Sequence, residues 1–103
     1  MSHLDVDGLT RRVVEWHGRS FPGSPNAAIG LKLAEEAGEC AKAVNLLEHG
    51  PAAWRTAYLD NLQDEIGDVV IVLVVLAHRY GLDLEEIVRS RSFVVTNRTP
   101  GPV

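Results

Sequence analysis

The fold of this chain follows from one continuous segment, which reads LQDEIGD at residues 62–68 and VVIVLVVLA at residues 69–77. The β-branched residues of its second half would also suit a buried strand. We predict a helix, because the apolar run continues a charged helical stretch and no turn signal precedes it. Nine apolar residues make about two and a half helical turns, so this helix is apolar in every direction and has to be buried on every side. A chain of 103 residues has few elements for that task. We therefore expect an oligomer whose core includes this helix.

The first half of this segment has a second copy earlier in the chain. Residues 33–39 read LAEEAGE, and both copies follow the pattern Leu, any residue, acid, Glu, apolar, Gly, acid. Each copy falls on one of two long predicted helices, and helices joined by a short connection usually pack antiparallel. We therefore expect the two copies to face each other with near two-fold symmetry.

Four helices account for nearly all of the chain. Turn and capping signals place them at about residues 5–19, 25–48, 52–80 and 84–95, with Ser24 and Asp83 as the N-caps of the second and fourth helices. A single break near residues 58–60 is an open alternative for the third helix. The sequence thus predicts an all-α fold: one domain over residues 1–103, a four-helix bundle completed by oligomerisation, with residues 98–103 as a frayed tail.

Composition and charge exclude several classes of protein. The 46% of hydrophobic residues can form a core, which excludes a disordered chain. The net charge of -4 argues against a nucleic-acid-binding protein, and the apolar run is too short to span a membrane. The single cysteine, Cys40, permits no internal disulfide, and the N-terminal residues lack the apolar core of a signal peptide. We expect a cytoplasmic protein with no nucleic-acid partner and no membrane association.

The acids of the repeat are candidates for a metal site. The helix face that carries Asp68 is buried one turn later, and a carboxylate at that depth needs a cation, a proton or a hydrogen-bonding partner. No Lys or Arg lies between Arg55 and Arg79. Several facing carboxylates with few bases favour a hard cation such as Mg²⁺, Mn²⁺ or Ca²⁺ over zinc. The alternative is a solvated polar surface, which is the more ordinary interpretation of the first copy taken alone.

The same residues resemble a known family. Glu35-Glu36-x-x-Glu39, followed on the next long helix by Glu65-x-x-Asp68, is similar to the signature of the MazG-like, all-α nucleoside triphosphate pyrophosphohydrolases. The resemblance covers residues 13–97 and extends to Trp16-His17, Phe21-Pro22-Gly23 and Lys32-Leu33-Ala34. It implies a helical bundle completed by dimerisation or tetramerisation. It also implies an enzyme that cleaves a nucleoside triphosphate between the α and β phosphates.

The resemblance assigns roles to the acids. It implies that four carboxylates hold Mg²⁺, namely Glu36, Glu39, Glu65 and Asp68. The acid at Glu35 would help to bind a further metal ion or orient the attacking water. These five acids are the implied catalytic residues, and Mn²⁺ is an alternative ion.

The resemblance also implies a set of substrate-binding residues: Trp16, His17, Lys32, Asn97 and Arg98. Trp16 or Phe21 would stack on the base, and His17 would hydrogen-bond to it. Related enzymes often carry a lysine shortly before the Asn-Arg pair, whereas this chain has apolar residues at positions 93–95. The chain therefore lacks one positive charge that related enzymes use for phosphate contact, which lowers the affinity for phosphate that the resemblance would imply.

The sequence therefore predicts a Mg²⁺-dependent nucleotide pyrophosphohydrolase that acts as a homodimer or homotetramer. It would convert a nucleoside or deoxynucleoside triphosphate to the monophosphate and pyrophosphate. The alternative is a non-catalytic helical oligomer that binds a divalent metal or a protein partner. The sequence does not determine the preferred base or sugar.

Overall fold

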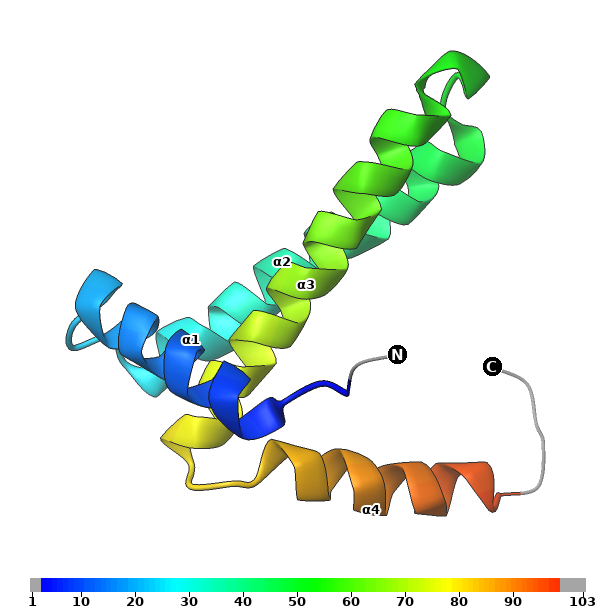
Figure 1. Cartoon of the computed structure of the whole chain (residues 1–103). Coiled ribbons are helices and arrows are strands. Elements are labelled where there is room, and N and C mark those ends of the chain that lie inside the picture. Colours follow the sequence, from blue (N-terminus) through cyan, green and yellow to red (C-terminus); the bar gives the residue numbers. More distant parts are fainter. Residues whose placement is uncertain (1–2, 99–103) are drawn as a thin grey trace.

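The structure of the chain is a computed structural model that describes residues 3–98. Within these residues it contains four α-helices, one 3₁₀ helix and no strand (Figure 1). The elements are α1 (Val6–Ser20), α2 (Asn26–His49), η1 (Ala52–Trp54), α3 (Arg55–Arg79) and α4 (Leu84–Thr96). The predicted all-α fold with four helices is confirmed. None of the described helices is long and apolar enough to cross a membrane. Residues 99–103 of the predicted frayed tail lie outside the described residues.

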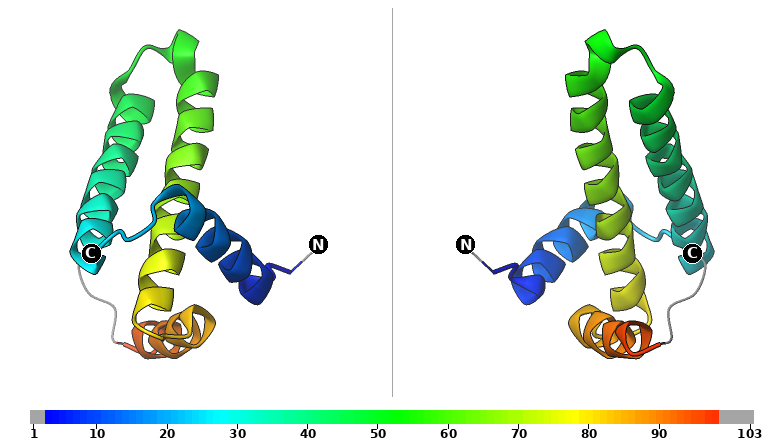
Figure 2. Two further views of the ribbon diagram at one scale, coloured as in Figure 1. Left: turned by 90° about the vertical axis from the view of Figure 1, so that its left-hand side faces the viewer. Right: turned by 90° about the vertical axis from the view of Figure 1, so that its right-hand side faces the viewer.

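The helices α2 and α3 form a long antiparallel hairpin (Figures 1 and 2). Buried and half-buried side chains recur along both helices in alternating steps of four and three residues, which is the spacing of a coiled-coil interface. They are Ile29, Leu33, Glu36, Cys40, Ala43 and Leu47 on α2, and Tyr58, Leu62, Glu65, Val69, Val72 and Leu76 on α3. We call these two rows the hairpin seam. Two carboxylates thus lie in an otherwise largely apolar seam.

The turn of the hairpin requires a glycine at position 50. The Gly50 amide donates a hydrogen bond to the Leu46 carbonyl oxygen at 2.7 Å and ends α2 after His49. A Cβ atom added at Gly50 would lie 2.5 Å from the Leu46 carbonyl oxygen and 2.6 Å from the ring of Tyr58, so a larger residue would fit only if the backbone of the turn shifted. Beyond η1, α3 runs without interruption, so the alternative of a break near residues 58–60 is wrong.

The core lies at the open end of the hairpin, where α1 crosses α3 (Figure 2). Val13 of α1 packs there with Ile29, Val74 and Val75. Only part of the nine-residue apolar run is enclosed by the single chain, since Val70 remains 38% exposed. The expectation that the run is buried on every side is therefore not met within one chain, because no described helix covers the outer face of α3. Oligomerisation stays a prediction.

One predicted helix cap is confirmed and one is wrong. Asp83 caps α4, because its Oδ1 atom accepts a hydrogen bond from the Glu86 amide at 3.1 Å. Ser24 does not cap α2; Pro25 takes the N-cap position, and no side chain accepts a capping hydrogen bond there. The Ser24 carbonyl oxygen instead accepts a hydrogen bond from Arg79 Nη1 at 2.6 Å. This contact holds the α1–α2 connection against the last turn of α3.

The corner between α3 and α4 is formed by Gly81, which has φ +66°. The Leu82 amide donates to the Ala77 carbonyl oxygen at 2.9 Å and the Gly81 amide to that of His78 at 3.0 Å, which together make a Schellman motif. The corner directs α4 away from the hairpin (Figure 1). Apolar side chains of α4 therefore stay on the surface, and Phe93 is 71% exposed.

Candidate metal centre and substrate cavity

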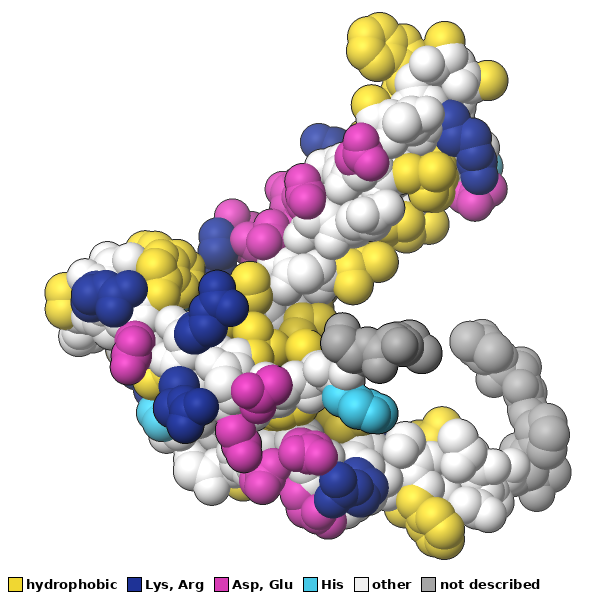
Figure 3. Space-filling model, in the orientation of Figure 1, with side chains coloured by type: hydrophobic (Ala, Val, Ile, Leu, Met, Phe, Trp, Pro, Cys, Tyr) yellow, Lys and Arg dark blue, Asp and Glu magenta, His cyan; other side chains and the backbone are white. Residues whose placement is uncertain are grey.

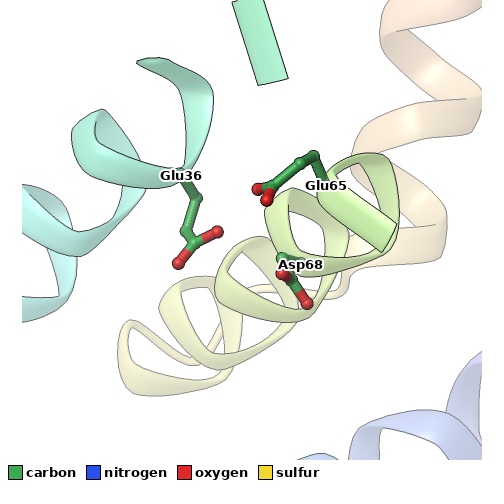
Figure 4. A group of neighbouring side chains, drawn as sticks. All are labelled: Glu36, Glu65 and Asp68. Carbon is green, nitrogen blue, oxygen red and sulfur yellow. The ribbon is translucent and has the colours of Figure 1, made fainter. Parts of the chain in front are cut away.

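Three acids from the two copies of the repeat meet between α2 and α3. Glu36, Glu65 and Asp68 each offer one carboxylate oxygen, and these oxygens all lie within 4.8 Å of one another. Figure 4 shows Glu36 and Glu65 pointing into the space between the helices, with Asp68 one turn further along α3. The predicted facing of the two copies is thus confirmed for these residues. We call them the three-acid cluster.

Glu65 is the enclosed member of the cluster. Its Oε2 atom is buried and has no hydrogen-bond partner. Burial raises the pKa of the Glu65 carboxyl, and the negative charges of Glu36 and Asp68 raise it further. An orphaned buried oxygen among like charges is unfavourable unless a cation or a proton is present. The donor set, carboxylate oxygens alone, fits a hard divalent cation such as Mg²⁺ or Mn²⁺.

The burial predicted for Asp68 is wrong. Asp68 is exposed, whereas Glu65 occupies a position in the hairpin seam. The apolar residues one turn after Asp68, Ile71 and Val72, are half-buried and line a cavity together with it. The depth of each acid follows from the register of the seam, which decides which helix face meets the partner helix.

The remaining two predicted acids lie outside the three-acid cluster. Glu35 is exposed, and its Oε1 atom is 3.4 Å from Lys32 Nζ. Glu39 is also exposed, one turn after Glu36, and its charge contributes to the raised pKa of Glu65. The structure thus brings together three of the five predicted acids and places the other two beside them on α2.

A cavity of about 580 Å³ opens next to the cluster. Glu36, Asp68 and Lys32 line it at one end, while Trp16, His17 and Phe21 supply aromatic side chains. Ser24 and five apolar residues complete the lining; the apolar residues are Ala28, Ile29, Ile71, Val72 and Val75. The cavity therefore joins a charged end, suited to phosphates and metal, to an apolar, aromatic end.

The aromatic residues of the cavity touch one another. The ring centroids of Trp16 and Phe21 are 5.8 Å apart in an edge-to-face arrangement, and those of His17 and Phe21 are 5.3 Å apart. Burial lowers the pKa of His17, and the positive charge of Arg79 lowers it further. The imidazole is therefore neutral at pH 7 and offers one hydrogen-bond donor and one acceptor. The three side chains together are suited to a planar ligand that forms hydrogen bonds at its edge.

Asn97 and Arg98 lie away from the cluster in the single chain. They follow the C-terminal end of α4, which extends away from the hairpin (Figure 1). The Asn97 side chain donates a hydrogen bond to the Phe93 carbonyl oxygen at 2.7 Å and so satisfies one of the free carbonyl groups at the C-terminal end of α4. Their role in substrate binding stays a prediction.

Sequence reasoning missed two features of the site. The first is Arg79, which holds the α1–α2 connection beside the cavity; no local signal marks a partner so distant in sequence. The second is the alternating four-and-three spacing that places Glu36 and Glu65 in the hairpin seam. That spacing is present in the sequence, and continuing the apolar row through the two acids would have revealed it.

Comparisons with known proteins identify the family of the chain. The family model described as MazG nucleotide pyrophosphohydrolase domain matches residues 25–101. The uncharacterized protein YvdC of Bacillus subtilis (strain 168) is 35% identical over 104 residues, which cover 95% of this chain and 96% of that protein. The dCTP pyrophosphatase 1 of Rattus norvegicus is 41% identical over 76 residues, which cover 71% of this chain but only 44% of the rat protein. No solved structure gives a significant match. The chain belongs to the MazG nucleotide pyrophosphohydrolase family.

Proposed function

We propose that the protein hydrolyses nucleoside or deoxynucleoside triphosphates between the α and β phosphates, with Mg²⁺ or Mn²⁺ as the required ion. The products would be the nucleoside monophosphate and pyrophosphate. The observation that carries this proposal is the three-acid cluster at the charged end of a cavity whose other end is aromatic. A nucleotide has the same division into a charged and a planar part.

The acids would serve to hold the ion. Glu36, Glu65 and Asp68 supply converging oxygens, and Glu39 lies one turn away on α2 to complete the set. A bound divalent ion would offset part of the negative charge of the triphosphate and lower the pKa of a water molecule bound to it. Glu35 is exposed beside this group and would orient the attacking water. The carboxylates alone would repel a triphosphate, so ion binding and substrate binding go together.

The aromatic end of the cavity would bind the base. Trp16 and Phe21 are 44% and 52% exposed in the single chain, so their rings are free to contact a ligand. The neutral His17 can donate and accept hydrogen bonds at a base edge. Because one relative is named dCTP pyrophosphatase 1, dCTP is the first substrate to test.

Pyrophosphate release from each common nucleotide, with and without Mg²⁺, tests the proposal directly. We expect release only with Mg²⁺, together with an equal amount of monophosphate. Asp68→Asn should lower the rate at least about a hundredfold, the scale on which loss of one preorganised charge-stabilising group acts. The matched control is Asp60→Asn, the same change at an exposed position of the same helix, and it should retain the wild-type rate.

Two results would contradict the proposal. Full activity of Asp68→Asn would exclude the cluster as the catalytic centre. Ion binding by calorimetry without pyrophosphate release from any nucleotide would favour the alternative, a non-catalytic metal-binding oligomer.

A further inference from the structure

Lys32 is the basic side chain that reaches the three-acid cluster. It lies one turn before Glu36 on α2, and its Nζ atom is 3.1 Å from Glu36 Oε1 and 3.4 Å from Glu35 Oε1. Among the residues that the structure describes, no other Lys or Arg forms an ion pair with Glu36, and none does so with Glu65 or Asp68. Lys32 therefore offsets part of the cluster's negative charge by pairing with one of the acids that fit a divalent ion.

The position of the Lys32 ammonium group is easily changed. Its side chain is 52% exposed, whereas that of Glu36 is 13% exposed. An exposed lysine pair contributes little to stability, and the four-carbon stem rotates freely. Lys32 also lines the cavity next to Glu36 and Asp68. Rotation of the side chain alone can therefore carry the ammonium from Glu36 to the cavity space.

We propose that Lys32 is an exchangeable counter-ion, which pairs with Glu36 in the metal-free protein and moves to a phosphate of the nucleotide when a divalent ion binds the cluster. This inference rests on the proposed function. An ammonium and a divalent ion at the same carboxylate repel each other, so they compete for Glu36. A displaced ammonium has three free donors, and phosphate oxygens are strong acceptors for it.

Binding of Mn²⁺ alone tests the competition without any turnover. The signal of free Mn²⁺ in electron paramagnetic resonance would be titrated with wild type, Lys32→Met, Lys32→Arg and Lys42→Met. We expect Lys32→Met to bind Mn²⁺ about three- to tenfold more tightly, because a competing charge is removed. Lys32→Arg keeps the charge and should bind no more tightly than wild type. Lys42→Met removes the same charge from the same helix, away from the cluster, and should stay within about twofold.

Nucleotide kinetics test the second half of the exchange. At saturating Mg²⁺, Lys32→Met should raise KM for the nucleotide about tenfold and change kcat much less, since it removes a charge-assisted phosphate contact. Unchanged or weaker Mn²⁺ binding by a folded Lys32→Met overturns the exchange and leaves the proposed function intact. Failure of the wild type to bind Mn²⁺ without nucleotide also overturns the exchange, whereas the proposed function is overturned only if Mg²⁺-dependent pyrophosphate release is absent.

Discussion

Glu65 carries a charge at a position of the hairpin seam where its neighbours, Leu62 and Val69, are apolar. Its buried Oε2 atom has no hydrogen-bond partner, and Glu36 and Asp68 repel it. Without a cation this arrangement opposes folding; with one it becomes a binding site. Stability of the metal-free protein and function therefore make opposite demands on this single side chain.

Glu65→Gln should raise the melting temperature of the metal-free protein and lower the rate of nucleotide hydrolysis at least about a hundredfold. The folded protein holds the Glu65 proton more tightly than the unfolded chain, because its pKa is raised above 4.5 in the fold. The associated stability is present in acid and is lost as pH rises through the raised pKa. The gain in melting temperature for the variant should thus be small below pH 4.5 and grow above it. Thermal unfolding in a metal chelator measures this, with Asp60→Asn as the control; a gain that does not vary with pH would contradict the assignment.

Arg79 connects two elements that are far apart in sequence. Its Nη1 atom donates to the Ser24 carbonyl oxygen at 2.6 Å and to Asn26 Oδ1 at 3.0 Å. These contacts fix the start of α2 and the α1–α2 connection against the last turn of α3. Phe21, which lines the cavity, belongs to the same connection. The shape of the aromatic end therefore depends on an element that contributes no aromatic residue.

Arg79→Met should lower the free energy of unfolding by about 1.5–3 kcal/mol, because charged hydrogen bonds to partly buried acceptors are lost. It should also raise the pKa of His17, since the Arg79 charge is one of the two causes that lower it. Urea unfolding and nuclear magnetic resonance titration of the His17 imidazole measure the two effects. Arg55→Met, an exposed arginine at the start of the same helix, is the control and should change neither quantity. Loss of stability with an unchanged His17 pKa would contradict the placement of Arg79 near the imidazole.

The features that the sequence predicted are those with local or repeating causes. Asp83 caps α4 as predicted because the cap and the amide it binds are three residues apart. The repeat predicted that Glu36 would face Glu65. The Ser24 cap was wrong: Pro25 takes the N-cap position, and Ser24 is instead held through its carbonyl oxygen by Arg79, which belongs to the other arm of the hairpin and is 55 residues away in sequence. The burial assigned to Asp68 was wrong for a similar reason, since packing between helices and not position along one helix decides which acid is enclosed.

The single chain leaves a large apolar surface uncovered. Figure 3 shows hydrophobic side chains on the hairpin, on α4 and at the C-terminal end of α1. Leu31, Ile66 and Phe93, one from each of α2, α3 and α4, are 73%, 50% and 71% exposed. Large apolar side chains left exposed on several helices favour contact with another protein chain. This supports the predicted homodimer or homotetramer.

Sedimentation equilibrium should give a mass two or four times the 11.3 kDa of the chain. Ile66→Glu places a charge on the uncovered face of α3. It should lower the association constant of the oligomer at least about tenfold and so favour the monomer. Gln63→Glu adds the same charge at an exposed polar position of the same helix and should leave the mass unchanged. A wild-type mass of one chain would contradict the prediction.

The three-acid cluster draws its oxygens from both arms of a hairpin whose only covalent link is the turn at residues 50–54. An ion that contacts both arms binds only while they are paired, so its binding free energy adds to that of closing the hairpin. At an ion concentration a hundred times the dissociation constant, ion binding raises the free energy of unfolding by about 2.7 kcal/mol. Local unfolding that exposes protease cleavage sites along α2 and α3 would then be rarest when the ion concentration is high. The supply of the ion would thus set the lifetime of the protein as well as its rate.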